Sequence, residues 1–349
     1  MLLDTIRKIK QSEYMKRVFL QKQEKLDFKF YQNVDDFIVT EQPINFTNKG
    51  NFIILKVKKV NLGTWDLIEK LATGLRIYDN EIGYAGLKDK NATTTQYLSI
   101  PRKYAKDIKK FKHNKIEILE TFLHKTKLNI GDLKGNAFEI NLHEVEEKDL
   151  FEIQKRIKQI SKIGLPNYFG YQRFGRDVKE NLDKARKVIY GELKIKDRKL
   201  EKMLISAYQS DFFNRWLAKR IELSKDLDDS YKLLAGDVMI NLEDEKVFTP
   251  KVINDKIQDD FNNHKTTFTG LLAGRGVYRA FGEAKEIEEQ FDDTYIQEKG
   301  LRRAAIVFPQ NVSVNYNKKE KKCKLKFILP KASYATVLVE NIANTSYFS

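Results

Sequence analysis

The chain has 349 residues, of which 41% are hydrophobic, and its net charge at neutral pH is +15. This length suggests about two domains of roughly 100–200 residues and permits a sizeable core. No apolar run approaches the ~18 residues of a membrane span, and the start lacks a signal-sequence pattern, so we expect a cytoplasmic protein. The positive charge favours a polyanionic partner, because cationic side chains release counterions when they meet phosphates.

Metal and disulfide chemistry have little support in the composition. Cys323 is the single cysteine, which excludes an intrachain disulfide and a cysteine-based zinc cluster. The four histidines are scattered and lack the pairing of metal-ligand motifs. We therefore expect no metal site.

Strand patterns dominate the first half of the chain. Residues 51–60 (NFIILKVKKV) are rich in β-branched residues and lysine, and residues 96–100 and 137–145 alternate apolar with polar side chains. Alternation of this kind is typical of half-buried strands. These segments predict an antiparallel sheet.

Two helices are predicted between and after these strands. Thr64 is a suitable N-cap with Asp66 in the first turn, and residues 151–163 form an amphipathic pattern that stops at Gly164. The apolar residues of the first helix fall on one face at helical spacing, which predicts that they are buried. They are Trp65, Ile68, Leu71, Ala72 and Leu75.

The charge distribution changes abruptly in the second half. Residues 221–298 contain 18 acidic and 9 basic residues, a net charge of −9, so the remainder of the chain carries +24. Strand-like, basic sequence returns in residues 302–314 and 322–329. Strands interleaved with helices predict an α+β fold.

The segment of residues 83–96, GYAGLKDKNATTTQ, contains the strongest chemical signal. It places Asp89 between Lys88 and Lys90 in a short loop between strand-like runs. A carboxylate held on a loop beside cations is suited to act as a nucleophile or general base. A solvated turn is the alternative interpretation of the same local pattern.

Several segments in register extend this pattern into a family resemblance. Residues 83–96 are similar to the signature of the TruD family of pseudouridine synthases, whose catalytic aspartate lies in a Gly-x-Lys-Asp loop followed by Ala and Thr-x-Gln. Further stretches resemble the family in the same order and cover nearly the whole chain. They are DDFIVTE (35–41), GNAFEI (135–140), PNYFGYQRFG (166–175), SAYQSDFFN (206–214) and LPKASYAT (329–336).

The resemblance implies a domain plan. It predicts a mixed, mainly antiparallel sheet domain of pseudouridine-synthase type, formed by residues 1–166 and 301–349. An α/β insertion domain, residues 167–300, would interrupt it. The acidic stretch falls within this expected insertion.

The resemblance also implies an activity. It predicts an isomerase that converts uridine 13 of tRNA to pseudouridine without a cofactor, and nothing in the sequence requires more than a monomer. A non-catalytic RNA-binding or ribosome-assembly factor on the same fold is the alternative. Another RNA-modifying enzyme, such as a methyltransferase, would need a glycine-rich cofactor loop after the first strand, and the sequence has none.

The family motifs assign roles to individual residues. By resemblance Asp89 is the catalytic carboxylate and Phe138 the ring on which uracil stacks. Lys88, its neighbour in the chain, is expected to be the cation that keeps Asp89 ionised. On spacing alone, the alternation with Ile140 and Leu142 favours a core position for Phe138. Asn136 shares the face of Phe138 and either contacts the uracil edge, positions Asp89 or caps a turn.

Three further residues are expected to bind substrate. Glu41 matches a family acid near the active site, and Arg173, in a glycine-punctuated segment, is expected to contact phosphate or the catalytic loop. Tyr334 stands where phenylalanine is commoner in the family. Many relatives carry an Arg-Glu pair after the residue that corresponds to Thr336, but this chain does not. Any role of that arginine therefore has no counterpart here.

Overall fold

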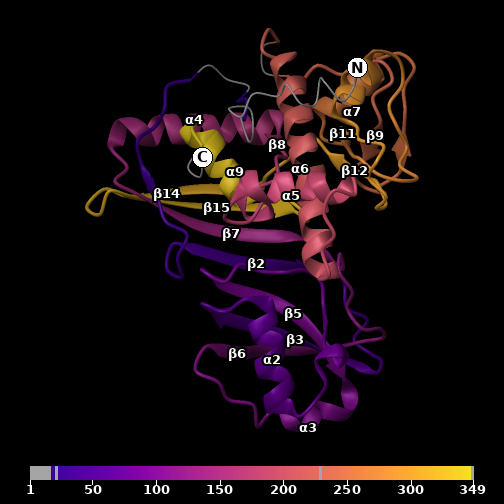
Figure 1. Ribbon diagram of the computed structural model, residues 1–349. Helices are drawn as coiled ribbons and strands as arrows, with labels where there is room; N and C mark the ends of the chain where they lie inside the picture. The colour runs from indigo at the N-terminus through magenta and orange to yellow at the C-terminus, as the bar shows by residue number, and fades with distance from the viewer. Residues whose placement is uncertain (1–16, 20–22, 228–229, 347–349) are drawn as a thin grey trace. The chain divides into compact units, whose positions relative to one another are not determined.

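The computed structural model describes residues 17–19, 23–227 and 230–346 (Figure 1). These residues divide into two compact units. The sheet unit comprises Asp27–Ile157 and Pro309–Ala332. The helical unit comprises the described residues up to Leu26, Lys158–Phe308 and the described residues from Ser333 onward.

The strands of the sheet unit are β1 (Lys29–Phe30), β2 (Phe37–Pro43), β3 (Phe52–Val60), β4 (Gly83–Tyr84), β5 (Thr93–Pro101), β6 (Ile116–His124), β7 (Leu133–His143), β14 (Gln310–Asn317) and β15 (Lys322–Pro330). Within the described residues they form one nine-stranded sheet, ordered β14-β15-β7-β2-β5-β3-β6, with β1 beside β7 and β4 beside β5. The β2–β5 pair is parallel, whereas the other pairs are antiparallel. The expected α+β class with a mainly antiparallel sheet is confirmed.

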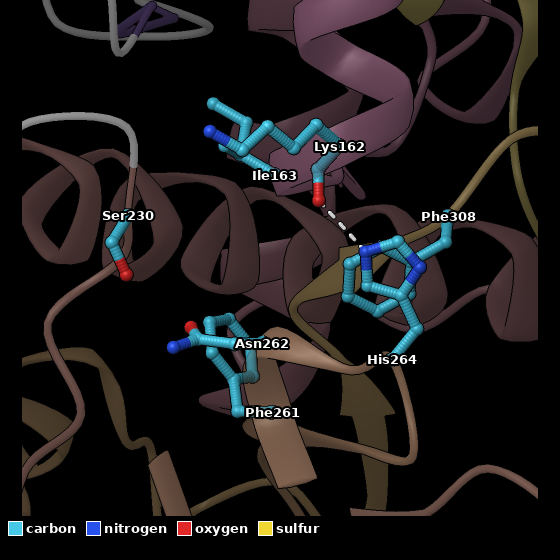
Figure 2. A pocket seen from close by; sticks show the side chains of 7 residues that line it. All are labelled: Lys162, Ile163, Ser230, Phe261, Asn262, His264 and Phe308. Carbon is cyan, nitrogen blue, oxygen red and sulfur yellow. Dashed lines mark hydrogen bonds between the residues drawn. The ribbon is translucent and has the colours of Figure 1, made fainter. Parts of the chain in front are cut away.

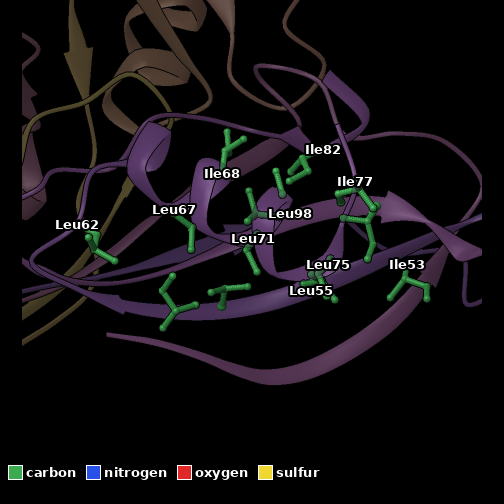
Figure 3. Packing of buried hydrophobic residues seen from close by; sticks show 14 residues of the cluster. Ile53, Leu55, Leu62, Leu67, Ile68, Leu71, Leu75, Ile77, Ile82 and Leu98 are labelled. Atoms are coloured by element: carbon green, nitrogen blue, oxygen red, sulfur yellow. The ribbon is translucent and has the colours of Figure 1, made fainter. Parts of the chain in front are cut away.

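Helix α2 (Thr64–Leu75) covers the β3–β5 part of this sheet. Figure 3 shows Leu67, Ile68 and Leu71 beside side chains of β3 and β5, such as Leu55 and Leu98. Burying each such side chain contributes roughly 1.5–3 kcal/mol. The apolar face of the helix therefore fixes its position over the strands that flank the Asp89 loop.

The start of α2 differs from the sequence prediction. Gly63, not Thr64, is the N-cap, because the Asp66 carboxylate accepts the Gly63 N–H at 3.0 Å. The hydroxyl of Thr64 is thereby released for contacts outside the helix. Trp65 was expected to be buried but is 59% exposed, with its ring 5.5 Å from that of Tyr84.

Short helical segments complete the sheet unit, and one longer helix continues into the helical unit. They are η2 (Asp79–Glu81), η3 (Arg102–Tyr104), α3 (Ala105–Ile108) and α4 (Glu147–Ile163). Helix α4 ends at the residue before Gly164, as predicted, and Gly164 has a φ of 94°, a value that favours glycine.

The helical unit contains α5 (Val178–Ile189), α6 (Arg198–Glu222), α7 (Asp255–Asn262), α8 (Gly282–Glu288), α9 (Ala335–Ala343), η4 (Tyr171–Arg173) and η5 (Glu289–Phe291). Its strands are β8 (Leu165–Pro166), β9 (Met239–Asn241), β10 (Val247–Phe248), β11 (Thr266–Leu272), β12 (Leu301–Ala304) and β13 (Ile306–Val307). They pair as β10-β9-β11-β12 and β13-β8. The strand-like run 302–314 is therefore divided among three strands. The expected catalytic and insertion domains stay a prediction, because compactness does not assign a role.

A buried ion pair organises the centre of the helical unit. Arg220 on α6 donates to both carboxylate oxygens of Asp237, at 2.6 and 2.9 Å, and also to the carbonyl of Lys232. Its guanidinium lies 4.4 Å from the ring centre of Phe268 on β11. Both charged side chains are almost completely buried, so the removal of one partner leaves the other charge uncompensated.

We predict that Arg220→Met lowers the free energy of unfolding by roughly 3–5 kcal/mol, because it leaves Asp237 buried without its cation. Urea denaturation measures this change. Lys246→Met is the control, since Lys246 is exposed and forms a surface pair with Asp244, and it should change stability by less than about 1 kcal/mol. Equal stability of the two variants would contradict the prediction.

Candidate active site

The loop between β4 and β5, residues 85–92, carries Asp89 and is tethered on both sides of it. The Lys88 N–H donates to the Thr64 hydroxyl at 2.8 Å, and the Asn61 N–H donates to the Ala92 carbonyl at 3.2 Å. Thr64 is the first residue of α2, whose apolar face packs on the sheet. The backbone on either side of Asp89 is thus attached to regular structure.

Lys59, near the end of β3, lies beneath this loop. Its side chain is fully buried, and its ammonium donates to the Asp89 carbonyl at 3.1 Å and to the Leu62 carbonyl. Among the described residues no carboxylate lies within 4 Å of this ammonium. A buried ammonium without a direct counterion is costly, and nearby carbonyls and the Asp89 charge compensate for that cost.

Lys88 contacts a different acid from the one expected. Its ammonium lies 2.5 Å from Glu41 Oε2, and Glu41 Oε1 accepts the Tyr97 N–H at 3.2 Å. Both charged side chains are buried. The role of Lys88 as the cation for Asp89 stays a prediction, but its direct partner is Glu41.

Burial and charge act in opposite directions on these groups. Burial raises the pKa of the Asp89 carboxyl, and the positive charges of Lys59 and then Lys88 oppose this rise. Burial likewise raises the pKa of Glu41, against the effect of Lys88. Burial lowers the pKa of Lys59 to about 8, and the Asp89 carboxylate is the main opposing influence. Lys59 is therefore the cation that most favours an ionised Asp89.

Asn136 on β7 lies beside Glu41. The two residues are direct partners in the antiparallel register of β2 and β7, so their side chains share one face of the sheet. Gly135 precedes Asn136, and a Cβ at position 135 would lie 2.3 Å from the Leu329 carbonyl. Glycine thus permits the close approach of β15 beside Asn136.

Phe138, two residues further along β7, is mostly buried in an aromatic cluster. It is 6% exposed, and its ring stacks on that of Phe327 at 5.4 Å and lies 6.1 Å from that of Phe37. This environment matches the core interpretation of the alternating pattern. The stacking role stays a prediction that depends on the small exposed part of the ring.

Three polar atoms on this face have no hydrogen-bond partner among the described residues. They are Thr94 Oγ1, Gln96 Nε2 and Asn136 Oδ1. Thr94 and Gln96 are fully buried, and the Gln96 carbonyl oxygen accepts from the Thr64 hydroxyl at 3.2 Å. Such groups are uncommon in folded proteins.

Arg173 and Tyr334 belong to the helical unit. The Arg173 guanidinium donates to the hydroxyls of Ser206 and Ser210 on α6, and the Tyr334 ring lies 6.1 Å from that of Phe169. The structure therefore gathers Asp89, Lys88, Glu41, Asn136 and Phe138 within the sheet unit. Their substrate contacts stay predictions, as do those of Arg173 and Tyr334.

Lys59 was not among the site residues predicted from the sequence. A signal was present, since residues 53, 55, 57 and 59 alternate on one face of β3 and the first three are apolar. When a lysine stands at a strand position whose alternation predicts a buried side chain, it implies a polar partner that is also buried. The partner could not be named, because the Asp89 carbonyl lies thirty residues away in the chain.

A separate hollow of about 300 Å³ lies in the helical unit, and none of the expected site residues lines it (Figure 2). His264 Nε2 lies 2.7 Å from the Lys162 carbonyl, and the imidazole stacks on Phe308 at 3.8 Å. Lys162 is in the last turn of α4, where free carbonyls accept such contacts. We assign His264 a structural role at this helix end.

Within residues 17–19, 23–227 and 230–346, no group of three or more His, Cys, Asp or Glu side chains could hold a metal ion. No helix in the same residues is long and apolar enough to cross a membrane.

Comparison with known proteins identifies the family. The profile of the family described as tRNA pseudouridine synthase D (TruD) matches residues 15–194 and 176–342. The tRNA pseudouridine synthase D of Nitratiruptor sp. is 39% identical over 95% of this chain and 98% of its own length. That of Wolinella succinogenes is 37% identical, with the same coverage.

A solved structure supports the fold. A crystal structure named as a tRNA pseudouridine synthase D from Methanosarcina mazei superposes with a TM-score of 0.72 at 22% identity, covering 95% of this chain and 97% of that chain. The structural match extends over both compact units, and the family profile spans most of the sequence. The chain therefore belongs to the TruD family.

Proposed function

We propose that this chain is a tRNA pseudouridine synthase that isomerises uridine 13 without a cofactor. In this reaction the bond between C1′ of ribose and N1 of uracil breaks, the base turns, and C1′ bonds to C5. The proton on C5 is lost and N1 gains one, so no atom is added overall. We further propose that the enzyme acts as a cytoplasmic monomer.

The proposed chemistry requires an ionised carboxylate in a fixed position next to the ribose and base. Asp89 is the proposed group, because its backbone is anchored by Lys59 while two cations oppose the effect of burial on its pKa. This anchoring of Asp89 is the observation that carries the proposal. A solvated turn would not need a fully buried lysine beneath it.

The neighbouring polar residues provide complementary groups for uracil. Asn136 Oδ1 could accept from N3–H, a donor that uracil has and neutral cytosine lacks. The exposed part of Phe138 offers a surface for the extruded base, and stacking of this kind contributes roughly 1–3 kcal/mol. The Glu41–Lys88 pair lies on the same side and would hold the loop in its reactive conformation.

The helical unit supplies further candidates for RNA contact. Arg173 is exposed and retains donors besides those bonded to Ser206 and Ser210. We propose that it contacts phosphate and that Tyr334 supports it by packing against Phe169.

We predict that Asp89→Asn lowers kcat for pseudouridine formation by at least about 10²-fold with little change in tRNA affinity, because the amide cannot act as a base or nucleophile. Unmodified tRNA transcripts, incubated without cofactor or metal, are assayed for pseudouridine at position 13. Asp79→Asn is the control, since Asp79 is an exposed acid of the same unit. If wild type binds tRNA but forms no product, the chain is a binding factor; full activity of Asp89→Asn would move the catalytic carboxylate elsewhere.

We predict that Lys59→Met, which removes the cation but keeps an unbranched side chain, changes the pH dependence of activity. Asp89 must be ionised, so activity is lost as pH falls through its pKa, and the loss of Lys59 raises that pKa. The acid limb of the kcat profile should move to higher pH. Lys58→Met is the control, since Lys58 is an exposed lysine of the same strand. An unchanged acid limb with only a lower thermal stability would limit Lys59 to a structural role.

A further inference from the structure

A basic segment, residues 102–115, connects β5 with β6. It contains seven lysine and arginine residues, one histidine and a single acid, Asp107. The Asp89 loop precedes β5 and the basic segment follows it. Because β5 has nine residues and a strand rises about 3.3 Å per residue, the two features lie roughly 30 Å apart.

Apolar and aromatic side chains hold this segment against the sheet unit. Tyr104, Ile108 and Phe111 pack against the core cluster formed with α2. A Cβ at Gly74 of α2 would lie 2.6 Å from the Phe111 ring, so the glycine allows the ring to approach the helix closely. The Tyr104 hydroxyl also donates to Glu81 at 3.1 Å. The cationic side chains of the segment therefore project from a backbone that is held in place by these contacts.

Most of these charges have no counterion. Lys103 pairs with Glu81 at 3.2 Å. In the described part of the chain, the other six cations are exposed and no carboxylate lies within 4 Å of them. They are Arg102, Lys106, Lys109, Lys110, Lys112 and Lys115. By contrast, two lysines of the β14–β15 turn are paired, Lys318 with Glu147 and Lys321 with Glu146.

A groove of about 530 Å³ runs between the basic segment and the outermost strand β6. Lys109, Phe111, Lys112 and His113 line one side, and Leu119, which is 40% exposed, lines the other. The β6 side also carries two acids, Glu117 and Glu120, of which Glu120 pairs with Lys56 at 2.7 Å. Phosphates are attracted by the lysines on one side of the groove and repelled by the acids on the other.

We propose that the basic segment and its groove form a second RNA-binding surface that contacts the tRNA backbone about 30 Å from the reacting uridine. The inference rests on the proposed function, because it takes tRNA as the partner. Unpaired cations on a fixed backbone lose no intramolecular ion pairs when they bind phosphate, and a groove that combines cations with an aromatic side chain is suited to RNA. The surface contributes to tRNA affinity and leaves the chemical step unchanged.

The test variant is Lys109→Gln/Lys110→Gln/Lys112→Gln, and binding of an unmodified tRNA transcript is measured across a range of KCl concentrations. Each lost phosphate contact reduces the slope of log affinity against log salt by about 0.7–0.9, so we expect a reduction of about 2–3. At 100 mM KCl we expect Kd to rise at least about tenfold, with kcat at saturating tRNA unchanged. We expect that a short D-arm hairpin does not reach the groove and binds the variant and wild type equally.

The matched control is Lys318→Gln/Lys321→Gln/Lys326→Gln, which removes the same formal charge from lysines that are already paired with carboxylates. We expect its Kd to change by less than about twofold. If both triple variants weaken tRNA binding equally, the effect depends only on the net charge of the protein, and the proposal is overturned. An unchanged Kd in the test variant would also overturn it and leave the surface to a protein partner. Failure of wild type to form pseudouridine, with salt-dependent binding intact, would instead reject the proposed function alone.

Discussion

The ammonium of Lys59 beneath the Asp89 loop is the contact on which the active-site arrangement depends. It joins the end of β3 to the backbone of Asp89, and it supplies the main positive charge that opposes the effect of burial on the Asp89 carboxyl. One buried cation thus affects both the position and the ionisation of the proposed catalytic group.

The sheet topology brings the remaining groups to the same face. The parallel pairing of β2 with β5 and the antiparallel pairing of β2 with β7 place Glu41 between the Lys88 loop and Asn136. A shift of one residue in either register would move Glu41 or Asn136 to the opposite face. The apolar and aromatic residues that fix these registers, Phe138 and Phe327 among them, are therefore as important to the site as its polar residues.

Local pattern predicted much of this arrangement, and the errors have physical causes. The loop around Asp89, the face shared by Asn136 and Phe138, and the main strands follow from alternation and motif spacing. Trp65 was assigned to the core because helical spacing defines a stripe but not its width, and the residue lies at the stripe's exposed edge. The partners of Lys88 and Lys59 lie 47 and 30 residues away in the chain, and a local pattern does not contain such contacts.

The most direct test of this account is a crystal structure of Asp89→Asn bound to an unmodified tRNA. We expect uridine 13 to be extruded from the RNA, with its base against Asn136 and the exposed part of Phe138 and its ribose beside residue 89. A uridine that remains stacked within the RNA, or one that binds away from this face of the sheet, would contradict it.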